Sequence, residues 1–273
     1  MSDEIIITRS QSSQSITTQP VSMFPTETIE LPSGGKFYPS DSPLSSGTIE
    51  IKMMTAKEED ILSNPNLLKK GIAVDKVLES LIVNKNIKLE DLLTGDKNAL
   101  IFSIRRLAYG DTYGPLQIKC PKCDSDNKIN VNLQDIQNQE QQTEFDSVNG
   151  LFEFELPYSK VVVKIKLMTG QTEKQIESEL TALQKINKQS TSEITTRLKH
   201  CIVQINNDTD RKVITTFVDT QLTSRDSLSL RQFIRKVTPD IDSTFNFNCS
   251  SCSHEERVAV PITANFFWPD ARV

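Results

Sequence analysis

The chain has 273 residues, with 31 Lys and Arg against 36 Asp and Glu, and a formal net charge of −5 at pH 7. This length predicts two structural units, or one unit with extensions, and a core large enough to need no disulfides. The acidic balance disfavours nucleic-acid binding, which usually requires a basic excess. No apolar run approaches the ~20 residues of a membrane span, and the N-terminus lacks a signal-peptide pattern, so we expect a cytosolic protein.

The sequence contains no recognisable catalytic motif. Neither histidine, His200 or His254, stands in the context of a nucleophile elbow, a metalloprotease or a kinase. Gly34-Gly35 is not followed by the Lys-Ser or Lys-Thr of a phosphate-binding loop. The acidic cluster Glu58-Glu59-Asp60 lies where a helix is expected to begin, and acidic residues are favourable there for structural reasons. We therefore expect that the protein is not an enzyme.

The first part of the chain predicts an arm, a strand and a helix. Residues 1–28 are rich in Ser, Thr and Gln without periodicity, which predicts a flexible N-terminal arm. Residues 49–53 alternate between apolar and polar side chains, as in a half-buried strand. Thr55 and Glu58 have the spacing of a capping box, so a helix is expected to begin there and to continue to about Leu62.

Two more helices and a β-ribbon are expected before a polar linker. Apolar side chains at helical spacing predict one helix from Asp75 and another over residues 99–109, with Gly110 as its C-cap. Alternating residues at 116–119 and 129–133 predict two strands, one on either side of a Cys-x-x-Cys turn. The following residues, 134–150, are mostly polar and predict a linker.

Beyond the linker, the pattern of the first half recurs. Four segments have counterparts: 30–32 in 155–157, 51–55 in 165–169, 78–83 in 198–203, and 93–94 in 222–223. From Leu93 onward, a constant displacement of 129 residues also carries Cys120 onto Cys249 and Cys123 onto Cys252. The sequence therefore predicts an internal duplication.

The two Cys-x-x-Cys pairs, Cys120/Cys123 and Cys249/Cys252, are the candidate metal ligands. Each pair can supply half of a tetrahedral zinc site, because two intervening residues let both thiolates turn toward one ion. No second pair lies within the usual ~15–20 residues of either, so neither pair can close a site locally. We expect one structural Zn²⁺ shared by both pairs, since four cysteines leave no open coordination position. His254 is an alternative ligand.

Other interpretations of these cysteines are weaker. A thioredoxin-type motif would begin a helix after a strand, which neither pair does. A disulfide suits a cytosolic chain poorly. Metal-free cysteines that persist from an ancestral zinc ribbon are the remaining alternative. The fifth cysteine, Cys201, lies on an apolar helix face and is expected to be buried without a ligand.

Two further segments carry expectations. The pair Arg105-Arg106 is expected on a solvated helix face. The apolar segment Asn265-Phe266-Phe267-Trp268-Pro269 is expected to pack on its own half of the chain rather than on a partner.

These features together predict an α+β fold of internally duplicated helical modules, each with a small antiparallel hairpin like that of a zinc ribbon. The expected boundaries are residues 1–28 for the arm, 29–133 for the first module, 134–150 for the linker and 151–273 for the second module. The zinc ion is expected to join the two modules.

Several segments, in this order, carry a family resemblance. They are Leu-Pro-Ser-Gly-Gly-Lys-Phe-Tyr-Pro at 31–39, Ile-Lys-Met-Met-Thr at 51–55 with the acidic helix at 58–62, Asp-Leu-Leu-Thr-Gly-Asp at 91–96, Ile-Arg-Arg-Leu-Ala-Tyr-Gly at 104–110 with Tyr113, and Cys-Pro-Lys-Cys at 120–123. Over roughly residues 28–265, the chain resembles the T-even-type bacteriophage baseplate protein family.

The resemblance implies a non-enzymatic structural or assembly role in the baseplate hub of a contractile phage tail. The protein would act in the host cytoplasm during assembly and then lie in the virion tail baseplate. Its partners would be other hub or tail proteins, with the tape-measure protein as a candidate, and neither a membrane nor nucleic acid. Two alternatives stay open: a zinc-ribbon nucleic-acid-binding protein, and a transient tail assembly chaperone that is absent from the finished particle.

Overall fold

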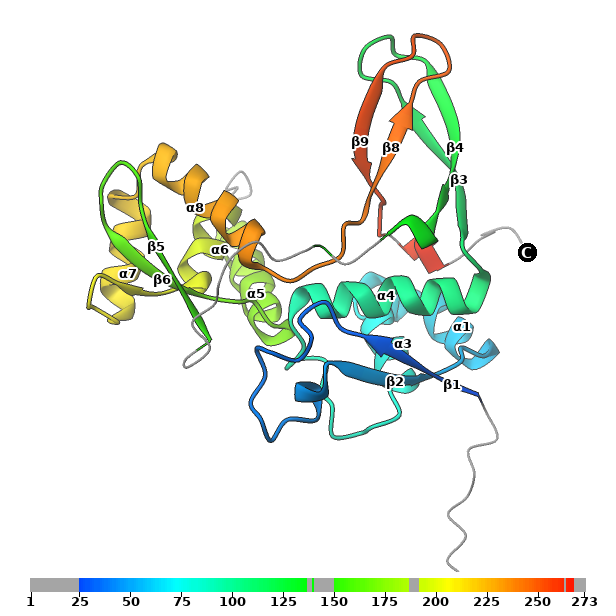
Figure 1. Cartoon of the computed structure of the whole chain (residues 1–273), viewed down its shortest axis with the longest axis horizontal. Helices are drawn as coiled ribbons and strands as arrows, with labels where there is room; N and C mark the ends of the chain where they lie inside the picture. Colours follow the sequence, from blue (N-terminus) through cyan, green and yellow to red (C-terminus); the bar gives the residue numbers. More distant parts are fainter. Residues whose placement is uncertain (1–24, 137–138, 140–149, 187–191, 263, 268–273) are drawn as a thin grey trace, which may run out of the picture.

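The structure, a computed structural model, describes residues 25–136, 139, 150–186, 192–262 and 264–267 (Figure 1). Helices and small antiparallel sheets make up the described elements, which confirms the predicted α+β class. Most of the expected arm, 1–28, and most of the expected linker, 134–150, lie outside the described residues. None of the described helices is both long enough and apolar enough to span a membrane.

The first half consists of a β-hairpin, four α-helices and a β-ribbon. Its elements are β1 (Thr26–Glu30), the 3-10 helix η1 (Pro43–Ser46), β2 (Thr48–Lys52), α1 (Ala56–Ser63), α2 (Pro65–Lys69), α3 (Ala73–Leu81), α4 (Thr94–Tyr109), β3 (Thr112–Lys119), β4 (Asp126–Asn132) and the 3-10 helix η2 (Leu133–Asp135). β1 pairs with β2 in antiparallel fashion, with Ile29 opposite Ile49. Residues 26–28 thus belong to a strand, although they fall within the predicted arm, because Ile29 packs on the core.

Local signals in the first half predicted the helix ends well. The backbone N–H of Thr55 donates to Glu58 Oε2 over 3.0 Å, as a capping box requires. The hydroxyl of Ser80 donates to the other carboxylate oxygen of Glu58 over 3.1 Å, so this buried acid caps α1 and ties it to α3. Gly110 ends α4 with a positive φ of 81°, as expected for a glycine C-cap.

The second half repeats the order of hairpin, helices and ribbon. Its elements are β5 (Leu151–Glu155), β6 (Val162–Lys166), α5 (Gly170–Ile186), α6 (Glu193–Cys201), β7 (Ile202–Ile205), α7 (Arg211–Thr220), α8 (Ser224–Val237), β8 (Thr244–Asn248), β9 (Glu255–Ala259) and the 3-10 helix η3 (Ala264–Phe267). The strands β5, β6 and β7 form a three-stranded antiparallel sheet in that order. Each half has its own hydrophobic core.

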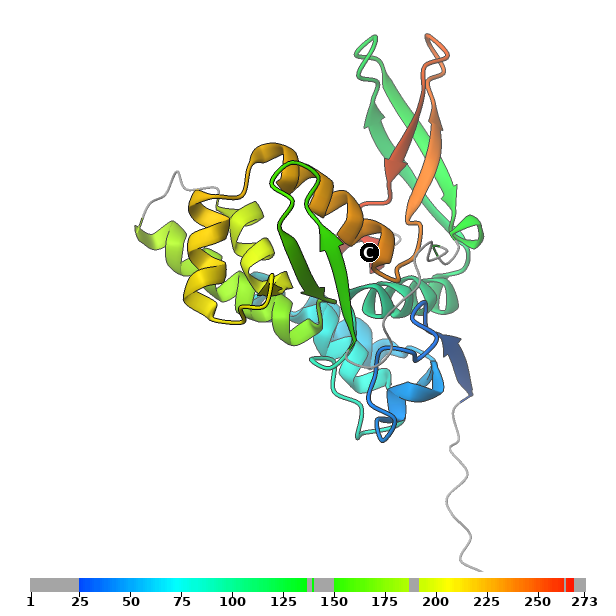
Figure 2. The same cartoon turned by 60° about the vertical axis from the view of Figure 1, so that its left-hand side comes forward.

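The two ribbons, β3–β4 and β8–β9, stand next to each other. They rise together beside α4 and away from both helical bodies, and their turns meet at the far end (Figures 1 and 2). A third, small apolar cluster lies between the ribbons and contains side chains from both. The ribbons are therefore packed on each other rather than on the helices of their own halves.

Each half ties its first hairpin to its last long helix through a buried aspartate. Asp96, in the first turn of α4, accepts hydrogen bonds from the Ser33 amide (2.9 Å) and hydroxyl (2.7 Å). Asp226, in the first turn of α8, accepts from the amides of Tyr158 (2.8 Å) and Ser159 (3.1 Å). Burial raises the pKa of Asp96. At Asp226, burial also acts to raise the pKa, but the hydrogen bonds from these two residues outweigh it and the pKa is lowered.

The two halves meet through a close approach of their backbones. The amide of Thr94 donates to the carbonyl of Met168 over 3.0 Å, and the amide of Gly170 donates to the carbonyl of Leu92 over 2.8 Å. A Cβ atom at Gly170 would lie 2.5 Å from the carbonyl oxygen of Leu89. Only glycine permits this contact, so Gly170 fixes the position of α5 against the first half.

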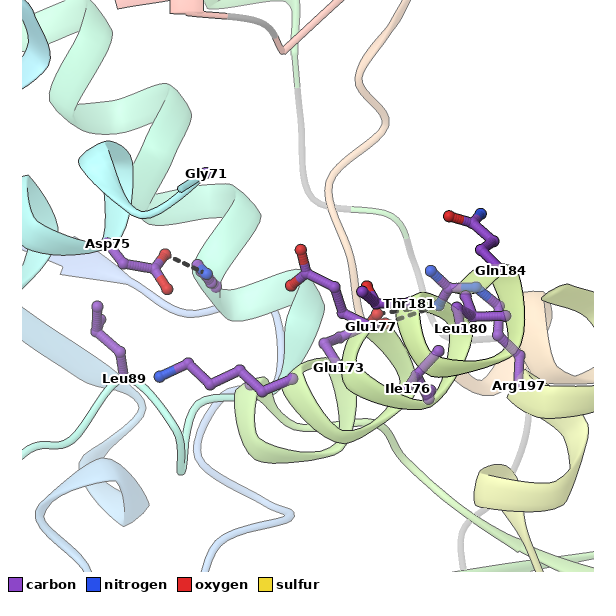
Figure 3. A pocket seen from close by; sticks show the side chains of 13 residues that line it. Gly71, Asp75, Leu89, Glu173, Ile176, Glu177, Leu180, Thr181, Gln184 and Arg197 are labelled. Carbon is purple, nitrogen blue, oxygen red and sulfur yellow. Dashed lines mark hydrogen bonds and ion pairs between the residues drawn. The ribbon is translucent and has the colours of Figure 1, made fainter. Parts of the chain in front are cut away.

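A polar pocket of about 500 Å³ lies beside this junction, between α3, α4 and α5 (Figure 3). Ion pairs involve six of the charged side chains in and around it: Asp75–Lys97 (2.5 Å), Arg197–Glu173 (2.9 Å) and Lys174–Glu90 (2.9 Å). The last pair joins α5 to the first half. Partly exposed pairs contribute little stability each, so their role here is to orient the two surfaces.

The C-terminal segment packs on the first half, so the expectation that it packs on the second was wrong. Phe266 and Phe267 are fully buried in the first core. The centroid of the Phe266 ring lies 4.9 Å from that of Phe102 and 5.0 Å from that of Tyr113. The reason is topological: β9 returns the chain to the base of the paired ribbons, beside α4. Trp268 and the residues after it lie outside the described residues.

This segment also explains why Arg105 is buried, contrary to the expectation of a solvated pair. Only 1 % of Arg105 is exposed. Its Nε donates to the carbonyl of Phe266 over 2.7 Å, and its guanidinium lies 5.0 Å from the centroid of the Tyr109 ring. Burial lowers its pKa. Arg106, in contrast, is only partly buried and pairs with Asp111.

We expect Phe266→Ala to lower the free energy of unfolding by about 3–5 kcal/mol, because it empties an aromatic site in the first core. The control is Tyr158→Ala, which removes a side chain from a residue that is 64 % exposed and should change stability by less than about 0.5 kcal/mol. Urea unfolding of both variants measures the difference. Equal stability of the two variants would contradict the packing of the C-terminal segment described above.

Candidate metal centre

Each cysteine pair lies in a tight turn between the strands of its ribbon. In the first turn, the Cys120 amide donates to the carbonyl of Ser125, and the Asp124 amide donates to the carbonyl of Cys120, both over 2.9 Å. Asp124 has a φ of 57°, a left-handed conformation that Asp tolerates better than most residues. This conformation folds the chain back, so that Cys120 and Cys123 face the same side.

The second turn has the same hydrogen bonds at matching positions. The Cys249 amide donates to the carbonyl of His254, and the Ser253 amide donates to the carbonyl of Cys249, again over 2.9 Å. Ser253 has a φ of 53°. Each of these residues lies 129 positions after its counterpart in the first turn. The strands share this displacement as well, because Lys119 pairs with Asp126 as Asn248 pairs with Glu255.

The four thiols converge at the meeting point of the two turns. All four Sγ atoms lie within 4.8 Å of one another. Across the ribbons, Cys120 Sγ lies 3.7 Å from Cys252 Sγ, and Cys123 Sγ lies 3.6 Å from Cys249 Sγ. Four sulfurs bound at about 2.3 Å to a tetrahedral zinc lie about 3.8 Å apart. A disulfide would need sulfurs at about 2.05 Å. The arrangement thus fits a four-cysteine metal site and not a pair of disulfides.

Apolar packing holds the two turns in place. Cys120 and Cys249 are buried together with Phe247, and Ile118 and Ile129 pack against them. This cluster lies between the ribbons directly below the thiols. The sulfurs are therefore positioned by the facing strands and not only by a bound ion.

Asn127 links the turns beside the thiols, and its role was not foreseen from the sequence. Its Oδ1 accepts from both the amide and the hydroxyl of Ser250, each over 2.9 Å. Its Nδ2 donates to the carbonyl of Ser125 over 3.0 Å and approaches Cys249 Sγ at 3.7 Å. Residues that orient ligands in this way tune metal affinity. A signal existed in the sequence, since the matching position of the other ribbon is Glu256 and breaks the repeat.

The thiols differ in acidity because of their immediate neighbours. Hydrogen bonding from Ser125, whose Oγ lies 3.3 Å from Cys249 Sγ, lowers the pKa of Cys249 to about 5. The neighbouring Cys123 raises the pKa of Cys252 to about 12. Without a cation, the four thiols therefore cannot all be ionised at neutral pH. A metal ion requires thiolates and displaces these protons, so its affinity falls as the pH falls.

The other two candidates lie apart from this cluster. Among the described residues, the group that could hold a metal ion consists of the four paired cysteines without His254. The His254 side chain lies 3.8 Å from a carboxylate oxygen of Glu256 instead. Cys201 is buried in the second core, as expected, and burial raises its pKa to about 12.

Fold and site together define an α+β protein whose two halves meet at a four-cysteine cluster able to hold a metal ion. The family model described as T4 bacteriophage base plate protein matches residues 23–268 of the chain. The chain therefore belongs to this family, as the resemblance predicted, and is a structural protein of the phage baseplate. No curated protein and no solved structure matches it.

We expect Cys249→Ser to abolish stoichiometric metal binding, because a three-cysteine remainder loses one side of the tetrahedron. Cys201→Ser is the matched control and should keep the full metal content, since Cys201 lies in a different core. Inductively coupled plasma mass spectrometry on purified protein measures both. Full metal content in Cys249→Ser would refute the four-cysteine site.

We expect Asn127→Ala to weaken metal binding by about 10–100-fold while leaving the metal-to-protein ratio unchanged at saturation. The loss follows because Ser250 and Cys249 both lose a hydrogen-bonding partner. Asn130→Ala, at an exposed position of the same strand, serves as the control. Competition with a chromophoric chelator gives the two affinities, and equal values would show that Asn127 has no part in the site.

Proposed function

We propose that this chain is a non-enzymatic structural or assembly protein of the hub of a contractile phage tail baseplate, in which one structural Zn²⁺ joins two repeat modules. The convergence of Cys120, Cys123, Cys249 and Cys252 is the observation that carries the proposal. The modules correspond to residues 29–133 and 151–273, with an arm before the first and a linker between them.

Zinc is the ion that suits this site best. Four thiolates in tetrahedral arrangement favour zinc over the oxygen-seeking cations Mg²⁺ and Ca²⁺. The site would be closed, so the ion would have no open position for a substrate and would serve as a structural link. Structural zinc contributes on the order of 10 kcal/mol to folding. Such a contribution would fasten the second half to the first at the end of the ribbons.

The proposed duplication rests on equivalent contacts in the two halves. Ile51 forms a β-bridge with Ile82, and their sequence counterparts Ile165 and Ile202 also pair. The two ribbons share one register and one set of turn hydrogen bonds. The aspartates Asp96 and Asp226 hold corresponding hairpin turns, although they are 130 residues apart rather than 129. The correspondence therefore shifts by one residue within α4 and α8.

The partners of the protein would be other hub or tail proteins, with the tape-measure protein as a candidate. The paired ribbons offer a protruding surface for such contacts, because they extend well beyond both helical bodies (Figure 2). Assembly would take place in the host cytoplasm and would bring the protein into the virion tail.

The charge of the ribbon turns argues against the alternative of a nucleic-acid-binding zinc ribbon. Lys119 and Lys122 are accompanied by four acidic residues, Asp124, Asp126, Glu255 and Glu256. Lys119 moreover pairs with Asp124 over 3.3 Å. Phosphate binding requires an uncompensated basic surface, which these turns do not provide.

Counting the protein in purified phage particles tests the role. Quantitative mass spectrometry against known tail proteins should give a fixed number of a few copies per tail if the protein is a hub component. Its absence from particles, combined with abundance in infected-cell lysate, would replace the structural role by that of a transient assembly chaperone. A copy number that varies between preparations would contradict both.

A further inference from the structure

A groove of about 400 Å³ runs between α6 and α8 of the second half, which we call the α6–α8 groove. Its apolar lining comes from both helices and from the residues that follow β6: Leu167, Met168, Ile194, Leu198 and Ile234. Ile194 is 47 % exposed. Exposed apolar side chains gathered in a concave surface are typical of a site that binds another apolar group.

The rim of the groove carries positive charge that is not neutralised. Lys166, Arg231 and Arg235 line the groove, and none has a carboxylate within ion-pair distance in the described part of the chain. The fourth cation, Arg197, is already held by Glu173 and Glu193. The acid at the junction end, Asp240, accepts a hydrogen bond from Asn98. The free charge of the rim therefore favours a negatively charged occupant.

The first half shows what occupies a corresponding position there. With the displacement of 130 residues between α4 and α8, Arg235 corresponds to Arg105. Arg105 is covered by the C-terminal segment and donates to the carbonyl of Phe266. Arg235 is exposed. This comparison rests on the proposed duplication, whereas the apolar lining and the charged rim stand without it.

We propose that the α6–α8 groove binds a short apolar peptide segment that carries acidic side chains, contributed by another baseplate protein. The apolar side chains of the segment lie on Ile194, Leu198 and Ile234. Its carboxylates pair with Arg231 and Arg235, one helical turn apart on α8. The proposal rests on the proposed role as a binding partner in the baseplate and assigns that role a surface.

Fluorescence anisotropy on the zinc-loaded full chain tests the proposal with two labelled probes, the peptides Asp-Leu-Phe-Glu-Leu and Lys-Leu-Phe-Lys-Leu. The acidic probe should bind with saturation, and the basic probe should bind at least about tenfold more weakly. The double variant Arg231→Glu/Arg235→Glu should weaken binding of the acidic probe by at least about tenfold. The matched control is Arg225→Glu/Lys236→Glu, which changes charge equally at exposed positions of α8 outside the groove and should leave binding unchanged.

A second variant tests the apolar part of the groove. Ile194→Ser keeps every charge and should also weaken binding of the acidic probe. Circular dichroism melts of all variants confirm that they are folded. No saturable binding of the acidic probe, equal binding of both probes, or equal loss in the control variant would each overturn the proposal. Light scattering that shows a dimer broken by Ile194→Ser would overturn it as well, because a second copy of this chain would then fill the groove. None of these outcomes depends on the particle count that tests the proposed function.

Discussion

The convergence of two short turns at four thiols is the constraint on which the rest of the structure depends. Neither Cys-x-x-Cys turn can close a tetrahedral site, because each supplies only two ligands. The turns must therefore be brought together by strands long enough to reach past the helical bodies. The facing ribbons β3–β4 and β8–β9 do this, with Phe247 and its apolar neighbours between them. Separation of the ribbons would expose this cluster and disperse the thiols.

Three further contacts make the halves one body rather than two modules on a linker. Backbone hydrogen bonds join the start of α4 to the start of α5, at a spacing that only Gly170 allows. Phe266 and Phe267 leave the second half and complete the first core, where Arg105 holds the Phe266 carbonyl. Asn127 joins the two turns beside the thiols. The connection is thus distributed from the junction to the tip of the ribbons.

Local patterns predicted the fold class, the cap of α1, the end of α4 and the pairing of the two cysteine turns, because these depend on short-range spacing or on a repeat. Contacts set by tertiary topology were not predicted. Arg105 and Phe266 are 161 residues apart, and nothing in either local sequence shows that one covers the other. Asn127 was missed for a related reason, since its partner Ser250 lies in the opposite turn.

Zinc K-edge X-ray absorption of the purified full chain, combined with its metal content, tests most directly whether one metal ion joins the halves. The account predicts one zinc per chain, with four sulfur ligands at about 2.3 Å and no nitrogen or oxygen ligand. A light-atom ligand in the coordination shell, two ions per chain, or an ion shared between two chains would contradict it.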